Sequence, residues 1–306
     1  MLNVIPDRKT AIEIEGQMKR ILRDLGNPEP PFKIEDALYL LELDRKYYSC
    51  ADEGFRQEVI HRIKVAGKQL ISRPSLLGEV ISKADLKALW LPDSKQILID
   101  QNMPPLKHRW AEVHEIAHSV IPWHKQFCLG DPAQTLSSSC RIQIENEANY
   151  GGGNLVFLGE RFKLEAADYS CNLESVKTLA NIYGNTITST LYRFVEQAHD
   201  HLPMFGVVCD HWFDSNIVFN AQNPCEHLIF SESFRNRFSN FDQHQAFDLI
   251  RGYCSQRKGG LLGEVEATVL DDNGEAHYFR MESFSNSYKI LTLAVYMNPI
   301  APQICL

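Results

Sequence analysis

The chain has 306 residues, of which 44% are hydrophobic and 23% are charged, a composition that excludes broad disorder and supplies a large core. Its length favours two or three domains. The formal net charge of −8 excludes an evenly basic surface for nucleic acids, although it leaves room for a local basic groove.

Apolar spacing and turn residues predict the elements of the N-terminal half. In chain order they are helices over 9–25, 34–43 and 53–71, strands over 88–91 and 96–99 joined as a hairpin, a helix over 104–121, a loop over 125–139 and a helix over 140–158. Gly151, Gly152 and Gly153 fall inside the last helix, where each glycine costs roughly 1 kcal/mol against alanine. We therefore expect either a closely packed second backbone at these glycines or a break in the helix.

The C-terminal half changes from helices to strands after Pro203. The predicted elements are two short helices within 173–198, strands over 205–209, 217–219 and 227–230, a helix over 238–253, and strands over 262–270, 277–284 and 289–296. Asp271-Asp272-Asn273-Gly274 is a strong hairpin signal between two of these strands. The whole pattern predicts an α+β protein.

One motif has the residues of a metal-binding catalytic site: His114-Glu115-Ile116-Ala117-His118, within the predicted helix over 104–121. Residues four apart lie on one face of a helix, so His114 and His118 can bind the same ion. Glu115 then lies beside the ion, where a general base removes a proton from water. The H-E-x-x-H string also arises by chance on exposed helices, but here it follows a strand and lies among apolar residues. We expect a catalytic zinc site.

Catalytic zinc takes a third protein ligand, for which two places are candidates. His124 has the spacing of the third histidine of metzincins, but Ile121 and Pro122 stand where those enzymes turn at a glycine. We expect His124 to be a surface histidine or a partner of a ligand. Glu145 and Glu147, on the next helix, are the other candidates, and either would complete a two-histidine, one-glutamate set.

The segments 107–118 and 145–149 resemble the ImmA/IrrE family of metallo-endopeptidases, which shows a basic and aromatic lead-in, H-E-x-x-H and then E-x-E-A-N. The resemblance is specific over roughly 86–158. It implies zinc held by His114, His118 and Glu145, with Glu115 as the general base. Asn149, one turn after Glu145, is expected to orient that ligand. The chain departs from the family at 151–158, where glycines replace the usual apolar residues and methionine-proline.

The resemblance also implies a fold and a substrate. We expect a zincin-like peptidase of gluzincin type with a small sheet over 1–165, a helix-turn-helix-like connector over 166–202 and a GAF-like sensor domain over 203–306. Family members cut a helix-turn-helix repressor and relieve repression after DNA damage or phage-related stress. By analogy with such peptidases, we expect the substrate to pair with the strand near 96–99.

Several further residues are candidates for regulation. Cys128 or Cys140 is a candidate inhibitory ligand that would block the open position of zinc. The connector carries too few net cations for tight DNA binding, so a packing role is favoured for it. A sensor domain is expected to take single-stranded DNA or another anionic activator. Its candidate basic residues are Arg235, Arg237, Arg251, Arg257 and Lys258.

Localisation and rival functions complete the expectations. Residues 1–8 carry no signal peptide, no apolar run spans a membrane, and the eight cysteines form no C-x-x-C pair, so we expect a cytoplasmic protein without a membrane partner. The rivals are a non-catalytic regulator or ligand sensor with structural zinc, and a metzincin-type protease that uses His124.

Overall fold

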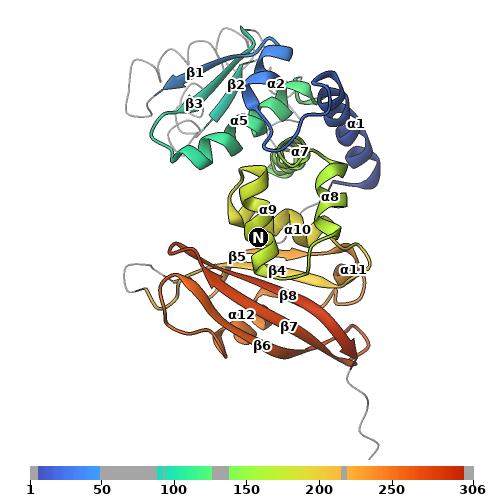
Figure 1. The fold of residues 1–306 in the computed structure, drawn as a ribbon, viewed down its shortest axis with the longest axis vertical. Helices are drawn as coiled ribbons and strands as arrows, with labels where there is room; N and C mark the ends of the chain where they lie inside the picture. The colour runs from blue at the N-terminus through green and yellow to red at the C-terminus, as the bar shows by residue number, and fades with distance from the viewer. Residues whose placement is uncertain (1–5, 49–87, 92–93, 126–137, 215–218, 300–306) are drawn as a thin grey trace, which may run out of the picture. The chain divides into compact units, whose positions relative to one another are not determined.

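The computed structural model describes residues 6–48, 88–91, 94–125, 138–214 and 219–299 (Figure 1). It contains helices and two separate sheets, as expected of an α+β protein. Contacts divide the chain into two compact units, residues 4–159 and 160–306. The helices predicted as a connector over 166–202 belong to the second unit together with the C-terminal strands, and the predicted domain limits otherwise stay a prediction.

The first unit carries the predicted motif helix and the helix after it. Its elements are α1 (Arg8–Asp24), α2 (Ile34–Leu40), β1 (Asp44–Tyr48), β2 (Ala88–Leu91), β3 (Gln96–Asp100), α5 (Pro105–Val120) and α7 (Ser138–Val156). Proline is well suited to the first turn of a helix, and α5 has Pro105 there. It ends before Pro122, which cannot continue a helix. The helix predicted over 53–71 and most of the loop over 125–139 lie outside the described residues.

The three-stranded sheet of this unit has the order β1-β3-β2. β3 pairs with β1 in parallel and with β2 in an antiparallel ladder that includes the predicted hairpin. Both edges of β3 are therefore occupied. The expectation that substrate pairs with the strand near 96–99 is wrong, because that strand has no free edge. Among the described strands of this sheet, β1 and β2 each have a neighbour on one side only.

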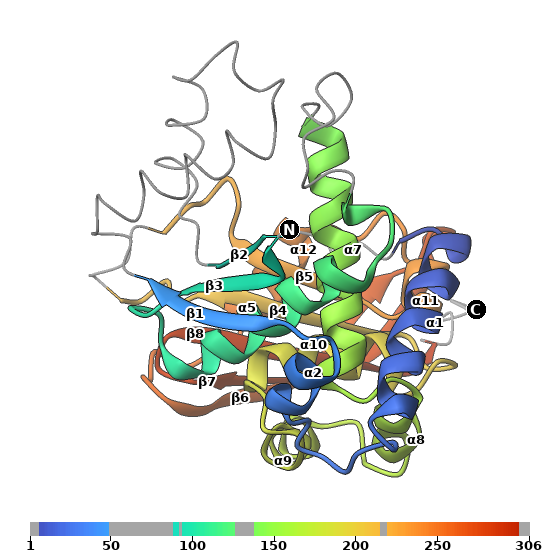
Figure 2. The same ribbon diagram turned by 90° about the horizontal axis from the view of Figure 1, so that it is seen from above.

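The glycines of α7 allow two helices to approach closely. α7 runs unbroken through them, and α1 and α5 both pack against it (Figure 2). A Cβ atom added to Gly152 would lie 3.1 Å from the carbonyl oxygen of Val113 in α5, and one added to Gly151 would lie 3.2 Å from the Ala117 Cβ. The first of the two expectations for this segment, a closely packed backbone, is confirmed.

The second unit is a five-stranded antiparallel sheet with helices. Its elements are α8 (Glu160–Ala167), α9 (Leu173–Tyr183), α10 (Ile187–Gln197), β4 (Met204–Asp210), β5 (Cys225–Phe230), α11 (Glu232–Arg235), α12 (Gln243–Arg251), β6 (Gly260–Leu270), β7 (Ala276–Ser285) and β8 (Lys289–Pro299). The strand order is β5-β4-β8-β7-β6. The predicted hairpin turn joins β6 to β7, with Gly274 in the left-handed region at φ 81°.

Strand β4 shows that this sheet is covered on both faces. Alternate residues of a strand point to opposite faces. Phe205 and Val207 lie in a buried cluster with Phe234 of α11 and Phe247 of α12. Gly206, between them, faces Val195 of α10, which a Cβ there would approach to 3.1 Å. The helices α9–α10 and α11–α12 therefore lie on opposite faces of the sheet (Figure 1).

Some predicted elements of this half need correction. The helix predicted over 238–253 begins only at Gln243, because the preceding Asp242 is its N-cap and forms a capping box with Gln245. The strand predicted over 217–219 falls mostly outside the described residues. β1, α8 and α11 were not predicted.

Candidate metal centre

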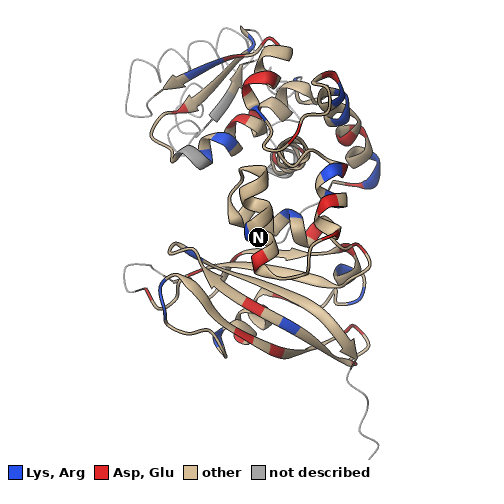
Figure 3. Ribbon diagram, in the orientation of Figure 1, with Lys and Arg blue, Asp and Glu red and all other residues tan. Residues whose placement is uncertain are grey.

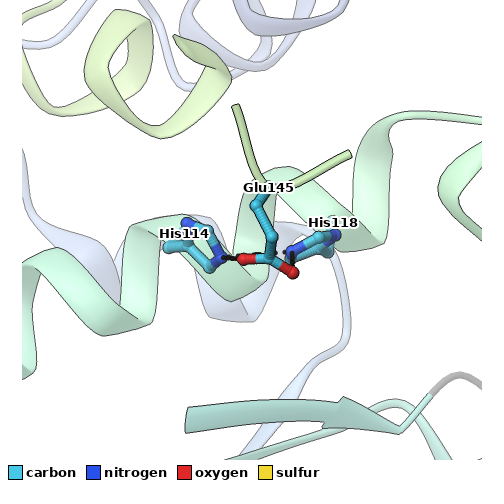
Figure 4. A group of neighbouring side chains, drawn as sticks. All are labelled: His114, His118 and Glu145. Carbon is cyan, nitrogen blue, oxygen red and sulfur yellow. Dashed lines mark hydrogen bonds and ion pairs between the residues drawn. The ribbon is translucent and has the colours of Figure 1, made fainter. Parts of the chain in front are cut away.

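Two adjacent helices supply the predicted ligands. His114 and His118 lie one turn apart on α5, and Glu145 comes from α7. The two imidazole Nε2 atoms are 3.1 Å apart. Glu145 Oε2 lies 3.1 Å from His114 Nε2, and Glu145 Oε1 lies 3.8 Å from His118 Nε2 (Figure 4). The structure thus brings together the three side chains that the sequence grouped as ligands.

A hydrogen bond to Asn149 decides which nitrogen of His114 faces this cluster. The amide oxygen of Asn149 lies 2.9 Å from His114 Nδ1. That oxygen only accepts, so Nδ1 carries the proton and the Nε2 lone pair of the neutral ring points at Glu145. A lone pair and a carboxylate at 3.1 Å repel each other, so this contact requires a positive charge: either a second proton on His114 Nε2, which then donates a hydrogen bond to Glu145 Oε2, or a cation between the two atoms. Two imidazoles and one carboxylate form a ligand set of catalytic zinc, so the three residues fit that ion.

Burial and neighbouring charges set the protonation of the cluster. Burial, together with the nearby His114, lowers the pKa of His118 to about 3, so His118 is neutral, the form that binds metals. Burial also opposes charge on His114 and Glu145. Burial is the largest single influence on both groups, but their mutual hydrogen bond and the opposite charges around them together outweigh it, so the pKa of His114 is raised and the pKa of Glu145 is lowered. Positive charge is therefore favoured between these two side chains.

Glu115 lies beside the cluster and outside the group of converging ligand atoms. Only 6% of it is exposed, and it accepts a hydrogen bond from the backbone N–H of Trp90 in β2. Burial raises the pKa of Glu115 to about 7, although the charge of His114 acts to lower it. A carboxyl group with a pKa near neutrality both accepts and returns a proton readily.

Two partner residues are placed differently from the expectation. Asn149 was expected to orient Glu145, but its hydrogen bond goes to His114. His124 is fully buried, which excludes a surface position, and its Nδ1 lies 3.0 Å from His118 Nδ1. It is therefore a partner of a ligand and stands outside the group of converging ligand atoms. Glu147, the other candidate acid, contacts His124 instead of the ligand cluster.

A second group, Asp271, Glu275 and His277, also has ligand atoms close together. In this group an arginine side chain supplies the positive charge that a metal ion would otherwise provide. The Arg237 guanidinium lies 3.5 Å from Asp271 Oδ2 and 3.1 Å from His277 Nε2. Asp271 Oδ1 in addition accepts the backbone N–H groups of Asn273 and Glu275 in the hairpin turn. We assign no metal to this group, which holds the β6–β7 turn.

The regulatory candidates are only partly described. Cys128 and the side chain of Cys140 lie outside the described residues, so an inhibitory thiolate stays a prediction. The expected sensor domain carries both acidic and basic residues (Figure 3), and some of the basic ones form ion pairs. Arg237 is held beside Asp271, and Lys258 Nζ lies 2.8 Å from Asp214. In the connector, Arg193 is buried beside Glu196, which removes one cation from reach of DNA.

Comparison with known proteins yields a fold and no family. No protein-family model and no curated protein matches the sequence. A similar solved structure is that of a Mycobacterium tuberculosis transcriptional regulator, 11% identical, with a TM-score of 0.53 over 94% of this chain and 88% of that chain. The two proteins share a fold. The likeness spans both units, so their combination in one chain is not peculiar to this protein.

No helix in the described part of the chain combines the length and apolar composition needed to cross a bilayer.

Proposed function

We propose that the chain is a zinc-dependent endopeptidase of the ImmA/IrrE type, with zinc held by His114, His118 and Glu145. The observation that carries the proposal is Glu115, a buried carboxyl group beside three converging ligands. A structural zinc site has no use for such a group. We further propose that the first unit is a zincin-like domain of gluzincin type and the second a GAF-like sensor domain.

The metal ligands, Glu115 and strand β2 each have a separate proposed role in peptide hydrolysis. Zinc, when bound, lowers the pKa of water at its open position towards about 7 and polarises a carbonyl group. Glu115 accepts the proton of the attacking water and passes it to the leaving amine, a role that suits its pKa of about 7. Trp90 links this base to β2, whose free edge among the described strands is the place we propose for an extended substrate.

The proposed substrate is a helix-turn-helix repressor, cut to relieve repression under stress, DNA damage or phage attack. The resemblance of segments 107–118 and 145–149 to the family supports this choice. The transcriptional regulator with the same fold is compatible with a role in gene control. Single-stranded DNA or another anion as activator, and a cytoplasmic site of action, belong to the same proposal.

A non-catalytic regulator containing zinc is the second candidate, and the name of that similar structure favours it. Glu115→Gln separates the two functions. Purified wild-type chain with zinc should cut a helix-turn-helix repressor from the same genome into two fragments, detected by mass spectrometry. Glu115→Gln should slow cleavage by about 10²- to 10⁴-fold and still bind zinc, because only proton transfer is removed.

Glu112→Gln is the matched control for this experiment. Glu112 is a buried glutamate on the same helix, but its carboxylate faces Arg45 at 2.9 Å and not the ligand cluster. Its substitution should leave the cleavage rate close to that of wild type. Absence of cleavage by the zinc-loaded wild type would refute the peptidase and leave the non-catalytic regulator, whereas cleavage by Glu115→Gln at the wild-type rate would refute Glu115 as the general base.

A further inference from the structure

A buried chain of polar side chains leads away from His118. His118 Nδ1 lies 3.0 Å from His124 Nδ1, and His124 Nε2 lies 2.9 Å from Glu147 Oε2. Trp123 Nε1 donates to the same carboxylate oxygen at 2.6 Å, and Gln143 Nε2 donates to Glu147 Oε1 at 2.8 Å. His124 is fully buried, and Glu147 is 2% exposed. Burying the three polar side chains of His118, His124 and Glu147 is costly unless each of them forms its hydrogen bonds, so the arrangement indicates a functional role.

The donors around Glu147 determine where the protons lie. The indole of Trp123 and the amide of Gln143 can only donate through these nitrogens, so both carboxyl oxygens of Glu147 act as acceptors. His124 therefore donates from Nε2 to Glu147. The neutral ring of His124 then has its lone pair on Nδ1, which accepts a hydrogen bond from the N–H at His118 Nδ1. As a result, the lone pair of His118 lies on Nε2, the atom that faces Glu145.

We infer that His124 and Glu147 are positioning residues that fix the tautomer and ring orientation of His118 for metal binding. This inference rests on the proposed zinc site and adds residues to it that the ligand set does not contain. A carboxylate behind a ligating histidine is a general means of fixing that ligand. Here an interposed imidazole extends the connection, and Asn149 does the corresponding work directly for His114. Both Nε2 lone pairs are thereby turned to one point.

The location of the two residues explains why they can hold His118 in place. His124 follows the C-terminal end of α5, where its N–H bonds the carbonyl oxygen of Ile121 at 3.1 Å. Glu147 lies two residues after Glu145 on α7. The pair thus ties the end of the histidine helix to the helix that supplies the carboxylate ligand. Loss of either residue frees the His118 ring to turn and to protonate on the wrong nitrogen.

Zinc affinity tests this inference without reference to peptide cleavage. In competition with a chromophoric chelator, His124→Leu and Glu147→Gln should each bind zinc about 10- to 100-fold more weakly than wild type. His124→Asn should fall between wild type and His124→Leu, because its amide oxygen can accept from His118 where Nδ1 did. With cobalt in place of zinc, the visible spectrum of His124→Leu should differ from that of wild type.

His277→Leu is the matched control. His277 is equally buried, and Asp271 holds its Nε2 at 3.0 Å, but it belongs to the other unit. It should lose thermal stability as His124→Leu does and keep wild-type zinc affinity. Wild-type affinity in His124→Leu and Glu147→Gln, or equal weakening in His277→Leu, would overturn the inference. If the zinc-loaded wild type cut no substrate while His124→Leu bound zinc more weakly, the peptidase would be refuted and the positioning role would stand.

Discussion

At the scale of single residues, burial decides which groups of this protein are charged. Burial raises the pKa of Glu115 to about 7, which suits a general base, and lowers the pKa of His118 to about 3, which keeps that imidazole neutral as a metal ligand. The sequence predicted both tasks from the H-E-x-x-H spacing. It did not predict the partner of Asn149 or the contact between His124 and Glu147, because these depend on the rotation of α7 against α5.

The thiol of Cys225 offers a test of burial elsewhere in the chain. It is 2% exposed, and burial raises its pKa to about 12, against about 8.5 for a thiol in an unfolded chain. The folded state therefore keeps a proton that the unfolded chain releases as the pH rises above about 8.5, and stability is lost in that direction. In urea melts from about pH 8.5 to about pH 10, wild type should lose about 1–2 kcal/mol more than Cys225→Ala. Parallel losses in the two proteins would show that this thiol does not change its pKa on folding.

At the scale of elements, the close contact of α5 and α7 sets the distance between the ligands. α5 carries both histidines and α7 carries Glu145, so the gap between the helices is part of the site. Glycine was the sequence signal for this contact. The sequence alone did not decide whether the glycines mark a closely packed helix or a break in α7, because a glycine lowers helix stability in both cases.

Gly152→Ala tests this contact. The new Cβ would meet backbone atoms of Val113 and His114 at 3.1–3.3 Å, which cannot turn away as a side chain would. The helices must separate, so we expect a loss of about 1–3 kcal/mol of stability in chemical denaturation, together with weaker zinc binding. Gly16→Ala, in the exposed interior of α1 with no atom within 4 Å, should gain up to about 1 kcal/mol and keep zinc. Equal effects of the two substitutions would contradict the close contact.

The elements that the sequence missed share a physical cause. β1 reads Asp44-Arg45-Lys46-Tyr47-Tyr48, which has little of the alternation typical of strands, and only Tyr48 in it is buried. Its pairing with β3 joins residues about fifty positions apart, and no local pattern reports such a contact. The analogy with related peptidases placed substrate beside β3, and the unpredicted β1 occupies the edge that substrate would need. α11 spans a single turn, too short for a helical period.

At the scale of the whole molecule, two compact units with separate sheets share one chain, and a protein of very different sequence has the same fold. The change from helices to strands after Pro203 was visible in the sequence. The unit boundary near Gly159 was not, because α8 was not predicted and the sequence of α9 and α10 predicted a separate connector, whereas both helices contact the sheet of the second unit. We propose that the first unit cuts substrate and that the second responds to a signal.

The position of zinc in the whole chain tests the account most directly. Crystals of the zinc-loaded protein, measured on both sides of the zinc absorption edge, should show one anomalous peak per chain. We predict that it lies about 2.0–2.2 Å from His114 Nε2, His118 Nε2 and a carboxylate oxygen of Glu145. A peak at Asp271 and His277, or none between α5 and α7, would contradict the account.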